Sequence, residues 1–345
     1  MGRSAPFALV AGVTLVTVGS VAYADTLIVL NKSEANISLI RPATGEVVAT
    51  LPVGEGPHEA ATSPDGRTVV VCNYGARTPG STLSIIDLPG KKVEATIDLV
   101  EYHRPHGIQY LPDGNHVVVT VEAEKKLLIV DVPGRKVAAA IDTDQDISHM
   151  VALSMDCKRA FVANIRSGSA TVIDLESRQR IRNIETGAGA EGVAVCPVRP
   201  EVWVSNRAAD TVTILDTETL DKIGEVPCAA FPIRVTFTPD GKTALVSCAR
   251  SGEVVIFDAA ERKEVRRVKM EAEAGTDAEE RLFGRTFGNS PVPVGILVEP
   301  TGRLAYVANT NADVVIVVDI AKGEIVRRVK AGKEPDGMAW SAIDL

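Results

Sequence analysis

Short apolar runs bounded by polar turn residues recur along nearly the whole chain. Examples are TVVVCN, which ends at Asn73, LSIIDL, which contains Asp87, and KVEATIDL, which starts at Lys92. Runs of this length that are rich in Val and Ile and are separated by Gly, Asn, Asp and Pro predict short β-strands joined by tight turns. The pattern therefore predicts a chain built almost entirely of β-strands.

A short phrase returns before these runs. Its seven copies are PHEAATSPDG at Pro57, PHGIQYLPDG at Pro105, SHMVALSMDC at Ser148, AEGVAVCPVR at Ala190, PIRVTFTPDG at Pro232, PVGILVEPTG at Pro293 and PDGMAWSAID at Pro335. Five of the six intervals between copies are 42 to 48 residues, and the sixth is 61. A self-similar period in the low forties indicates a β-propeller. With the phrase counted as a strand, each repeat supplies four strands, which make one blade.

The two ends of the repeat array complement each other. After its first 24 residues the chain begins with three strands, TLIVLN, ISLIRP and VVATLPV, that lack a preceding phrase, and it ends with a phrase that lacks following strands. Together they make one complete blade, which closes the ring and removes the open sheet edges. We therefore expect an all-β, seven-bladed β-propeller over residues 25–345, with four antiparallel strands per blade and the N-terminal strands paired with the C-terminal strand.

The strings FVAN, WVSN and YVAN, each followed by a strand similar to VID, a G-x-x-P turn and SPDG, resemble the YVTN-repeat family of bacterial β-propellers. The resemblance covers essentially all of residues 25–345. It implies the propeller fold and a place among periplasmic, lactonase-like and quinoprotein or heme-enzyme propellers. It assigns no activity, because one fold serves many functions.

The first 24 residues predict a secretory signal peptide. They contain Arg3, an apolar stretch over residues 7–18 and the small-x-small ending Ala22, Tyr23, Ala24. This composition favours cleavage before Asp25 and a periplasmic or secreted protein with no membrane span in the mature chain. The alternative is an uncleaved anchor, although the apolar stretch is shorter than a spanning helix requires.

The charge balance excludes some partners. The formal net charge is −8 for the full chain, and it becomes −9 when Arg3 is removed with the leader. An acidic surface disfavours nucleic acid and anionic membranes as partners.

The five cysteines carry no C-x-x-C spacing, so they do not predict a zinc ribbon or a redox motif. Cys228 precedes a phrase and Cys248 ends the strand after it, which places both near one end of the same predicted blade. In an exported protein these two are a candidate disulfide. The alternative is that they are small buried hydrophobic residues.

The second residue of the phrase is where the copies differ most informatively. In chain order it is His58, His106, His149, Glu191, Ile233, Val294 and Asp336. In propellers of this kind the first strand of each blade runs along the central channel, so the first four side chains are expected to converge at the mouth of the axial funnel. Three imidazoles and a carboxylate suit a divalent transition metal, Zn, Fe, Mn or Cu. The alternative is that histidine is a tolerated polar residue at a wet channel entrance, copied with the repeat.

Two further repeat positions, directly after the second strand of each blade, carry several cationic residues. Arg166 and Arg250 share one position, and Tyr74, Glu122 and Arg207 share the position before it. Arg234 comes from the phrase itself. Guanidinium groups bind carboxylates and phosphates through paired hydrogen bonds. The predicted ligand-binding residues, for a small anionic molecule, are Arg166, Arg207, Arg234, Arg250, Tyr74 and Asp336. Taken singly, each arginine is also typical of a solvated turn.

The 61-residue interval contains an insert at about residues 271–292. Its charged first half predicts a short helix near Asp277, and its second half offers Phe283, Arg285 and Phe287. A long loop in a compact domain is usually functional or disordered. The alternatives are a lid over the funnel and a surface excursion.

Three functions remain open. The chain has no G-x-S-x-G, no H-E-x-x-H and no C-x-x-C-H motif. We expect an exported binding protein that holds a metal ion, a small anionic ligand or both at the axial funnel. The alternatives are a metal-dependent hydrolase or lyase that uses the same His and Glu residues, and a scaffold for periplasmic redox or envelope proteins.

Overall fold

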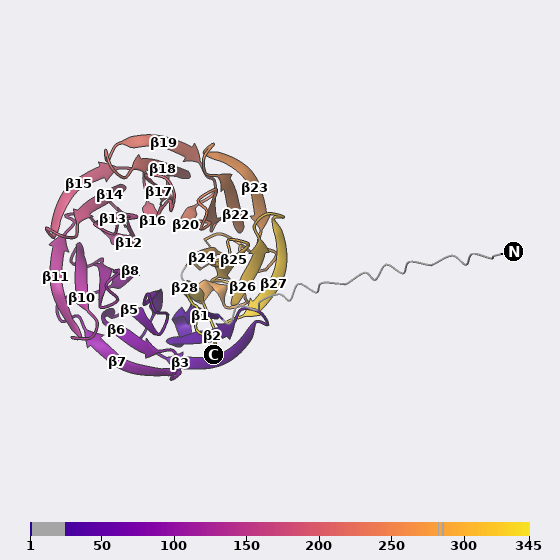
Figure 1. Cartoon of the computed structure of the whole chain (residues 1–345), viewed down its shortest axis with the longest axis horizontal. Helices are drawn as coiled ribbons and strands as arrows, with labels where there is room; N and C mark the ends of the chain where they lie inside the picture. Colours follow the sequence, from indigo (N-terminus) through magenta and orange to yellow (C-terminus); the bar gives the residue numbers. More distant parts are fainter. Residues whose placement is uncertain (2–24, 282, 285) are drawn as a thin grey trace.

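The structure is a computed structural model that describes residues 1, 25–281, 283–284 and 286–345. Residues 2–24, which carry the predicted signal peptide, lie outside the described residues, as do Leu282 and Arg285. The described chain forms seven four-stranded antiparallel sheets arranged around a central axis (Figure 1). Its helical segments are two 3-10 turns, η1 (Lys32–Glu34) and η2 (Ala278–Glu280). The predicted seven-bladed β-propeller is confirmed.

Each blade contains four strands that follow one another from the axis outward. The first three blades are β28 (Pro335–Ser341), β1 (Thr26–Asn31), β2 (Asn36–Arg41) and β3 (Glu46–Pro52); β4 (Pro57–Thr62), β5 (Thr68–Gly75), β6 (Pro79–Asp87) and β7 (Lys92–Asp98); and β8 (Pro105–Tyr110), β9 (His116–Val121), β10 (Lys126–Asp131) and β11 (Lys136–Asp142). The next two are β12 (Ser148–Leu153), β13 (Arg159–Asn164), β14 (Ser169–Asp174) and β15 (Gln179–Glu185); and β16 (Ala190–Val195), β17 (Glu201–Asn206), β18 (Thr211–Asp216) and β19 (Lys222–Pro227). The last two are β20 (Pro232–Phe237), β21 (Thr243–Cys248), β22 (Glu253–Asp258) and β23 (Lys263–Lys269); and β24 (Pro293–Val298), β25 (Leu304–Asn309), β26 (Val314–Asp319) and β27 (Glu324–Lys330).

The ring closes where the two ends of the array meet. The C-terminal strand β28 pairs antiparallel with β1, with Leu27 opposite Trp340 and Ile28 opposite Ala339. The other six blades are each formed by four strands consecutive in sequence. The predicted closure is therefore confirmed.

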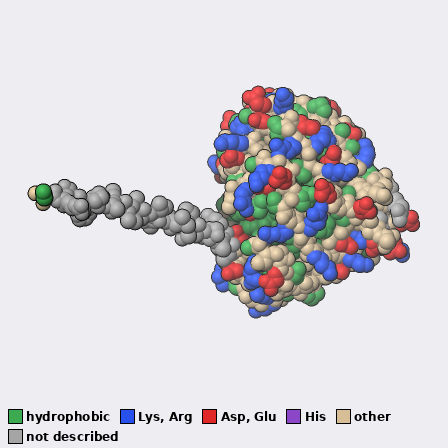
Figure 2. Space-filling view, turned by 90° about the vertical axis from the view of Figure 1, so that its right-hand side faces the viewer, with side chains coloured by type: hydrophobic (Ala, Val, Ile, Leu, Met, Phe, Trp, Pro, Cys, Tyr) green, Lys and Arg blue, Asp and Glu red, His purple; other side chains and the backbone are tan. Residues whose placement is uncertain are grey.

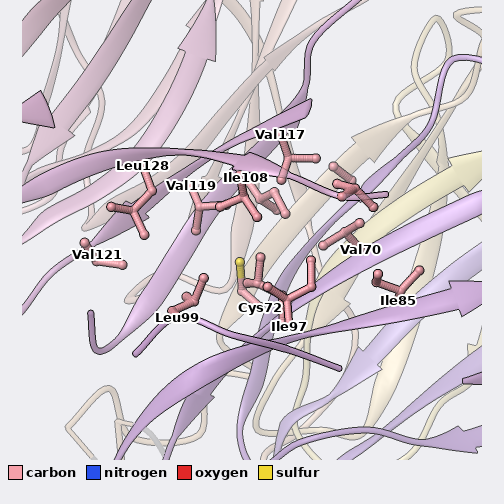
Figure 3. Close-up of a cluster of buried hydrophobic side chains, with 14 residues drawn as sticks. Val70, Cys72, Ile85, Ile97, Leu99, Ile108, Val117, Val119, Val121 and Leu128 are labelled. Carbon is pink, nitrogen blue, oxygen red and sulfur yellow. The ribbon is translucent and has the colours of Figure 1, made fainter. Parts of the chain in front are cut away.

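The hydrophobic core lies between neighbouring blades. One cluster joins the β4–β7 blade to the β8–β11 blade through Val70, Cys72, Ile97, Val119 and Leu128 (Figure 3). Middle strands such as β9 and β25 are buried almost throughout, because a blade packs on each of their faces. Outer strands alternate; in β27 exposed residues alternate with partly buried ones. The middle runs are therefore almost continuously apolar, whereas the outer runs carry charged residues such as Glu324, Arg328 and Lys330 among their exposed positions.

The outer surface mixes charges of both signs. Figure 2 shows Lys and Arg side chains interspersed with Asp and Glu over the visible face. In the part of the chain that the structure describes, no helix has the length and apolar character to cross a membrane.

The cysteines are unbridged in the described chain. The Sγ atoms of Cys228 and Cys248 lie 3.7 Å apart. Cys228 directly follows β19, the outer strand of one blade, whereas Cys248 ends β21 of the next. The expected proximity is therefore confirmed, although Cys228 lies in the crossover that leads from β19 into the blade of Cys248 and not in that blade itself.

Each inner strand starts with a left-handed residue and then a bulge. The residue before the strand has a positive φ, between 53° and 77°, in all seven blades: Gly56, Arg104, Ile147, Gly189, Phe231, Val292 and Glu334. The register of the inner strand against its neighbour shifts at the second and third residues of the phrase; for example, Pro57 pairs with Asn73 and Ala60 with Val71. The extra residue on the inner strand bends it and turns the second side chain out of the regular sheet.

Neighbouring inner strands touch at this bulge. In three blades a Ser or Thr hydroxyl on the second strand makes two hydrogen bonds at the bulge. It accepts from the backbone N–H of the third residue of the phrase in its own blade, and it donates to the backbone carbonyl of the second residue of the phrase in the next blade. Ser205, for example, accepts from Gly192 at 2.9 Å and donates to the Ile233 carbonyl at 2.9 Å. Four of the seven third positions are glycines, and a Cβ there would lie 2.0 to 2.6 Å from that same carbonyl of the next blade: Gly107, Gly192, Gly295 and Gly337.

We expect Gly337→Ala to destabilise the protein by about 1–3 kcal/mol, the usual cost of forcing extra volume into a packed interior. Its Cβ would lie 2.1 Å from the backbone oxygen of His58, which cannot move without shifting β4. Urea unfolding measures the effect. The matched control is Gly224→Ala in β19, whose Cβ would meet the flexible end of Arg262 at 3.0 Å. It should be neutral or slightly stabilising, and equal destabilisation in both variants would contradict the packing argument.

Candidate functional site

The bulges line one end of the axial channel with polar side chains. The cavity there has a volume of about 410 Å³. Its lining residues are Lys32, His58, Tyr74, Gly75, Ala76, Arg104, His106, Glu122, Ile147, His149, Ile165, Glu191, Arg207, Arg234, Phe283, Val294 and Asp336. The cavity therefore draws side chains from all seven blades.

Six of the seven second-position residues of the phrase line this cavity. All five polar residues at this position line the cavity: His58, His106, His149, Glu191 and Asp336. Val294 also lines the cavity, and Ile233 does not. The repeat column that the sequence singled out is therefore the wall of a single site.

Four rings stand side by side along the cavity wall. Tyr74 stacks on His58 at a centroid distance of 4.5 Å, His58 meets His106 edge-on at 4.9 Å, and the rings of His106 and His149 lie 3.6 Å apart. These side chains come from β5, β4, β8 and β12, which belong to three consecutive blades. The three histidines therefore converge as the sequence predicts, because the bulges direct them to the axis.

His149 lies between two carboxylates. Its Nδ1 is 2.5 Å from Oε1 of Glu122, and its Nε2 is 3.4 Å from Oε1 of Glu191. Burial alone would lower the pKa of His149, but the two carboxylates outweigh burial and raise it. The Tyr74 hydroxyl donates to the other oxygen of Glu122 at 2.6 Å. Burial alone would raise the pKa of Glu122, but His149 and Tyr74 outweigh it and lower the pKa.

His106 and His58 are in the opposite situation. Burial, together with the neighbouring His149, holds the pKa of His106 well below its usual value. Burial and Lys32 lower the pKa of His58, although Asp336 opposes them. Nδ1 of His58 lies 3.1 Å from Oδ2 of Asp336 but outside hydrogen-bond geometry, and Nδ1 of His106 is buried with no partner; both atoms lack a hydrogen bond among the described residues. Both rings are therefore neutral at pH 7, the form that binds metals.

A network of charges closes the inner end of the cavity. Arg234 donates through Nη2 to Glu59 at 2.9 Å and through Nη1 to Glu191 at 3.3 Å. Arg234 is on β20 and Glu59 is on β4, so this ion pair crosses the axis between blades that are not neighbours in the ring. Arg234 also lines a second cavity of about 430 Å³ farther along the channel, so it separates the two spaces. Burial alone would raise the pKa of Glu191, but His149, Arg207 and Arg234 lower it to about 2.

Three of the lining residues form a group that could hold a metal ion. One ligand atom each from His106, Glu122 and His149 lies within 4.8 Å of the others. The metal ligands expected from the sequence are His58, His106, His149 and Glu191. The structure groups two of these with Glu122, while His58 and Glu191 line the same cavity outside the group.

The predicted ligand-binding residues divide into two groups. Tyr74, Arg207, Arg234 and Asp336 line the cavity. Arg166 and Arg250 are exposed and are absent from its lining. The side chain of Arg250 lies 3.5 Å from Asp210 and covers the ring of Phe231.

The residues that line the cavity and the arginines that do not occupy adjacent positions of the repeat. The residue directly after the second strand's terminal Asn, or its equivalent, lines the cavity in five blades: Lys32, Tyr74, Glu122, Ile165 and Arg207. Arg166 and Arg250 come one residue later, in the turn, where their side chains are exposed and absent from the lining. Glu122 and Lys32 were not predicted as site residues, although they occupy the same repeat position as Tyr74 and Arg207, which were. The Asn residues themselves are structural; Asn73, for example, donates to Thr82 and Ser84.

The insert is anchored beside the cavity. Arg281 is buried and forms ion pairs with Asp277 and Asp313. Phe283 lines the cavity and packs against Phe231 and Phe287. The helix expected near Asp277 is the three-residue turn η2. Arg285 lies outside the described residues, and the role of the insert as a lid stays a prediction.

Comparison with known proteins agrees with this architecture. Residues 147–276 match the family model of YNCE-like β-propellers. This match covers less than half of the chain. Among curated proteins, none matches it.

Two solved structures show the same fold. Hydrazine synthase from Kuenenia stuttgartiensis is similar over 81% of this chain and 88% of that chain, with 18% identity and a TM-score of 0.68. The dihydro-heme d1 dehydrogenase NirN, solved in complex with DHE, is similar over 91% of this chain and 74% of that chain, with 16% identity and a TM-score of 0.64. The resemblance to bacterial β-propellers is confirmed. At these identities it extends to the fold and not to the activity.

We expect Arg234→Met to destabilise the protein by about 3–5 kcal/mol, because it leaves Glu59 and Glu191 buried without their shared cation. Urea unfolding measures the loss, and Arg234→Met combined with Glu59→Met should recover part of it. Arg250→Met is the control, since this exposed arginine is expected to contribute little. Similar losses in Arg234→Met and Arg250→Met would show that the buried network does not stabilise the fold.

We expect His106→Phe to make stability less sensitive to acid. The depressed pKa of His106 keeps its ring neutral in the folded protein, whereas the unfolded chain takes up the proton below pH 6.5, so stability is lost as pH falls below that value. The groups facing or acting on His106 are His58, His149, Tyr74, Glu122, Arg234 and Lys32. The variant should lose less stability between pH 7.5 and 5.5, by at most about 1.4 kcal/mol per pH unit below pH 6.5.

Urea unfolding at the two pH values measures this difference. Val294→Ala is the control, because it changes packing in the same repeat column and removes no titratable group. Its loss of stability between the two pH values should equal that of the unsubstituted protein. An unchanged pH dependence in His106→Phe would contradict the assignment of a neutral, buried imidazole.

Proposed function

We propose that this protein is an exported binding protein that holds a divalent transition-metal ion at the axial funnel. The observation that carries the proposal is the group of His106, Glu122 and His149, whose ligand atoms lie within 4.8 Å of one another. A second observation supports it. Nδ1 of His106 is buried without a hydrogen-bond partner among the described residues, which is costly unless a ligand completes the site.

The donor set indicates which metals fit. Two imidazole nitrogens and a carboxylate oxygen suit Zn, Cu, Fe or Mn, and the general order of affinities at such sites favours Cu²⁺ and Zn²⁺ over Fe²⁺ and Mn²⁺. Glu122 contacts one nitrogen of His149 and Glu191 the other, so a metal would replace the proton on one nitrogen while the carboxylate on the other nitrogen orients the ring. Tyr74 orients Glu122. Outer contacts of this kind orient metal ligands and raise their affinity. His58 and Glu191 are the nearest supporting residues of the predicted set.

The mouth of the funnel suits an anionic ligand as well. The Arg104 guanidinium lies 4.6 Å from the centroid of the Tyr74 ring, and that of Arg207 lies 5.3 Å from that of Phe231. Both arginines line the cavity and neither is fully buried. A small carboxylate or phosphate bound there would complement the positive charge of the metal and the two arginines. Export is the part of the proposal that rests on the leader-like first 24 residues.

Metal titration of the metal-free protein tests this function. We expect one equivalent of Zn²⁺ or Cu²⁺ to bind by isothermal titration calorimetry, with elemental analysis confirming the stoichiometry. His106→Ala and His149→Ala should each weaken binding by roughly 100-fold or more, and Tyr74→Phe, which removes only the hydrogen bond to Glu122, by roughly 10-fold.

His116→Ala provides the matched control. This histidine pairs with Asp113 and lies outside the cavity, so its removal should leave affinity unchanged. Circular dichroism of each variant distinguishes a lost ligand from a lost fold. Unchanged affinity in the His106→Ala, His149→Ala double variant, or an equal loss in His116→Ala, would rule out the proposed site.

A further inference from the structure

We infer that Cys228 and Cys248 form a disulfide bond that joins two neighbouring blades beside the funnel. Their Sγ atoms lie 3.7 Å apart, and both side chains are fully buried. A disulfide bond is about 2.05 Å long, so the two sulfur atoms are already in contact and need only a side-chain adjustment to bond. The inference rests on the proposed export, because such bonds persist in oxidising compartments.

The backbone holds both cysteines in place before any bond forms. The N–H of Cys228 donates to the carbonyl of Asp210 at 2.8 Å, which ties it to the turn after β17 in its own blade. Cys248 is paired in register with Pro232, the first residue of β20. The crossover from Cys228 to Pro232 is therefore fixed at both ends. The bond would close a loop between residues 20 positions apart.

The position of this loop gives the bond a consequence for the funnel. The crossover carries Phe231, whose ring lies 5.3 Å from the guanidinium of Arg207. Arg207 in turn donates to Glu191 at 2.6 Å. The closed loop also contains Arg234, which bridges Glu191 and Glu59. The bond therefore fastens the segment that positions two of the cations around Glu191.

The chemistry is thiol–disulfide exchange with an external disulfide, such as that of a thiol–disulfide oxidoreductase. The two cysteines lose two protons and two electrons and form one S–S bond, while the external disulfide is reduced to two thiols. The neighbouring Cys228 thiol and burial raise the pKa of Cys248 well above its usual value. The buried Cys248 thiol is consequently a poor nucleophile once folded, and we expect the exchange during folding.

Peptide mapping tests the pairing directly. The full chain with its leader is expressed in a bacterium, recovered from the periplasm without reductant, alkylated in denaturant and digested with trypsin. We expect residues 223–234 and 243–250 to be recovered as one disulfide-linked pair that separates on reduction. The three remaining cysteines, Cys72, Cys157 and Cys196, should all be alkylated. Five alkylated cysteines in the exported protein, or a different pairing, would overturn the inference.

Refolding separates this inference from export. Reduced protein refolded in a glutathione redox buffer should form the same linked pair. Reduction should then lower the melting temperature by roughly 5 °C in the unsubstituted protein and in Cys72→Ala, but not in the Cys228→Ala, Cys248→Ala double variant. If the chain is not exported but forms the Cys228–Cys248 bond on refolding, the proposed export is wrong and the proposed disulfide is supported. A chain that refolds with five free thiols overturns the pairing whatever its location.

Discussion

The contact between neighbouring inner strands is the constraint on which the rest of the molecule depends. At the bulge, Ser205 and its equivalents Thr120 and Ser247 bridge a freed N–H in one blade and a freed carbonyl in the next. The blades approach so closely there that four third-position residues are glycines. The bulge recurs in all seven inner strands and turns the second side chain of the phrase out of the sheet, and five polar side chains from this position meet in a single cavity.

Burying so many polar groups requires that each be compensated. Glu191 accepts from Arg207 and Arg234, Glu59 accepts from Arg234, and Glu122 holds His149. Glu191 and Arg207 belong to one blade, but the other pairs join different blades, so the charges of the site also hold the ring together across its axis. Three side-chain atoms of the cavity nevertheless remain buried without a hydrogen-bond partner among the described residues: Nδ1 of His58, Nδ1 of His106 and Oδ1 of Asp336.

The cavity therefore combines a rigid scaffold with an incompletely satisfied set of ligand atoms. The ring atoms of His149 are oriented by Glu122 and Glu191, and Glu122 is oriented by Tyr74. Preorganised ligands of this kind lose little conformational entropy when a metal binds. The second, separate feature of the same region is the crossover at Cys228, which carries Phe231 to the rim and sits against Cys248.

The propeller, the number of blades and the closure through β28 and β1 could all be predicted from the amino-acid sequence, because each blade is specified by local strand and turn patterns that repeat. The histidine column could be predicted as well, since the same repeat position faces the axis in blade after blade. That Glu122 joins His106 and His149, and that Arg166 and Arg250 stay outside, became visible in the folded chain alone. Side-chain contacts across the axis join residues far apart in the chain, and their distances depend on how seven bulges pack around one another.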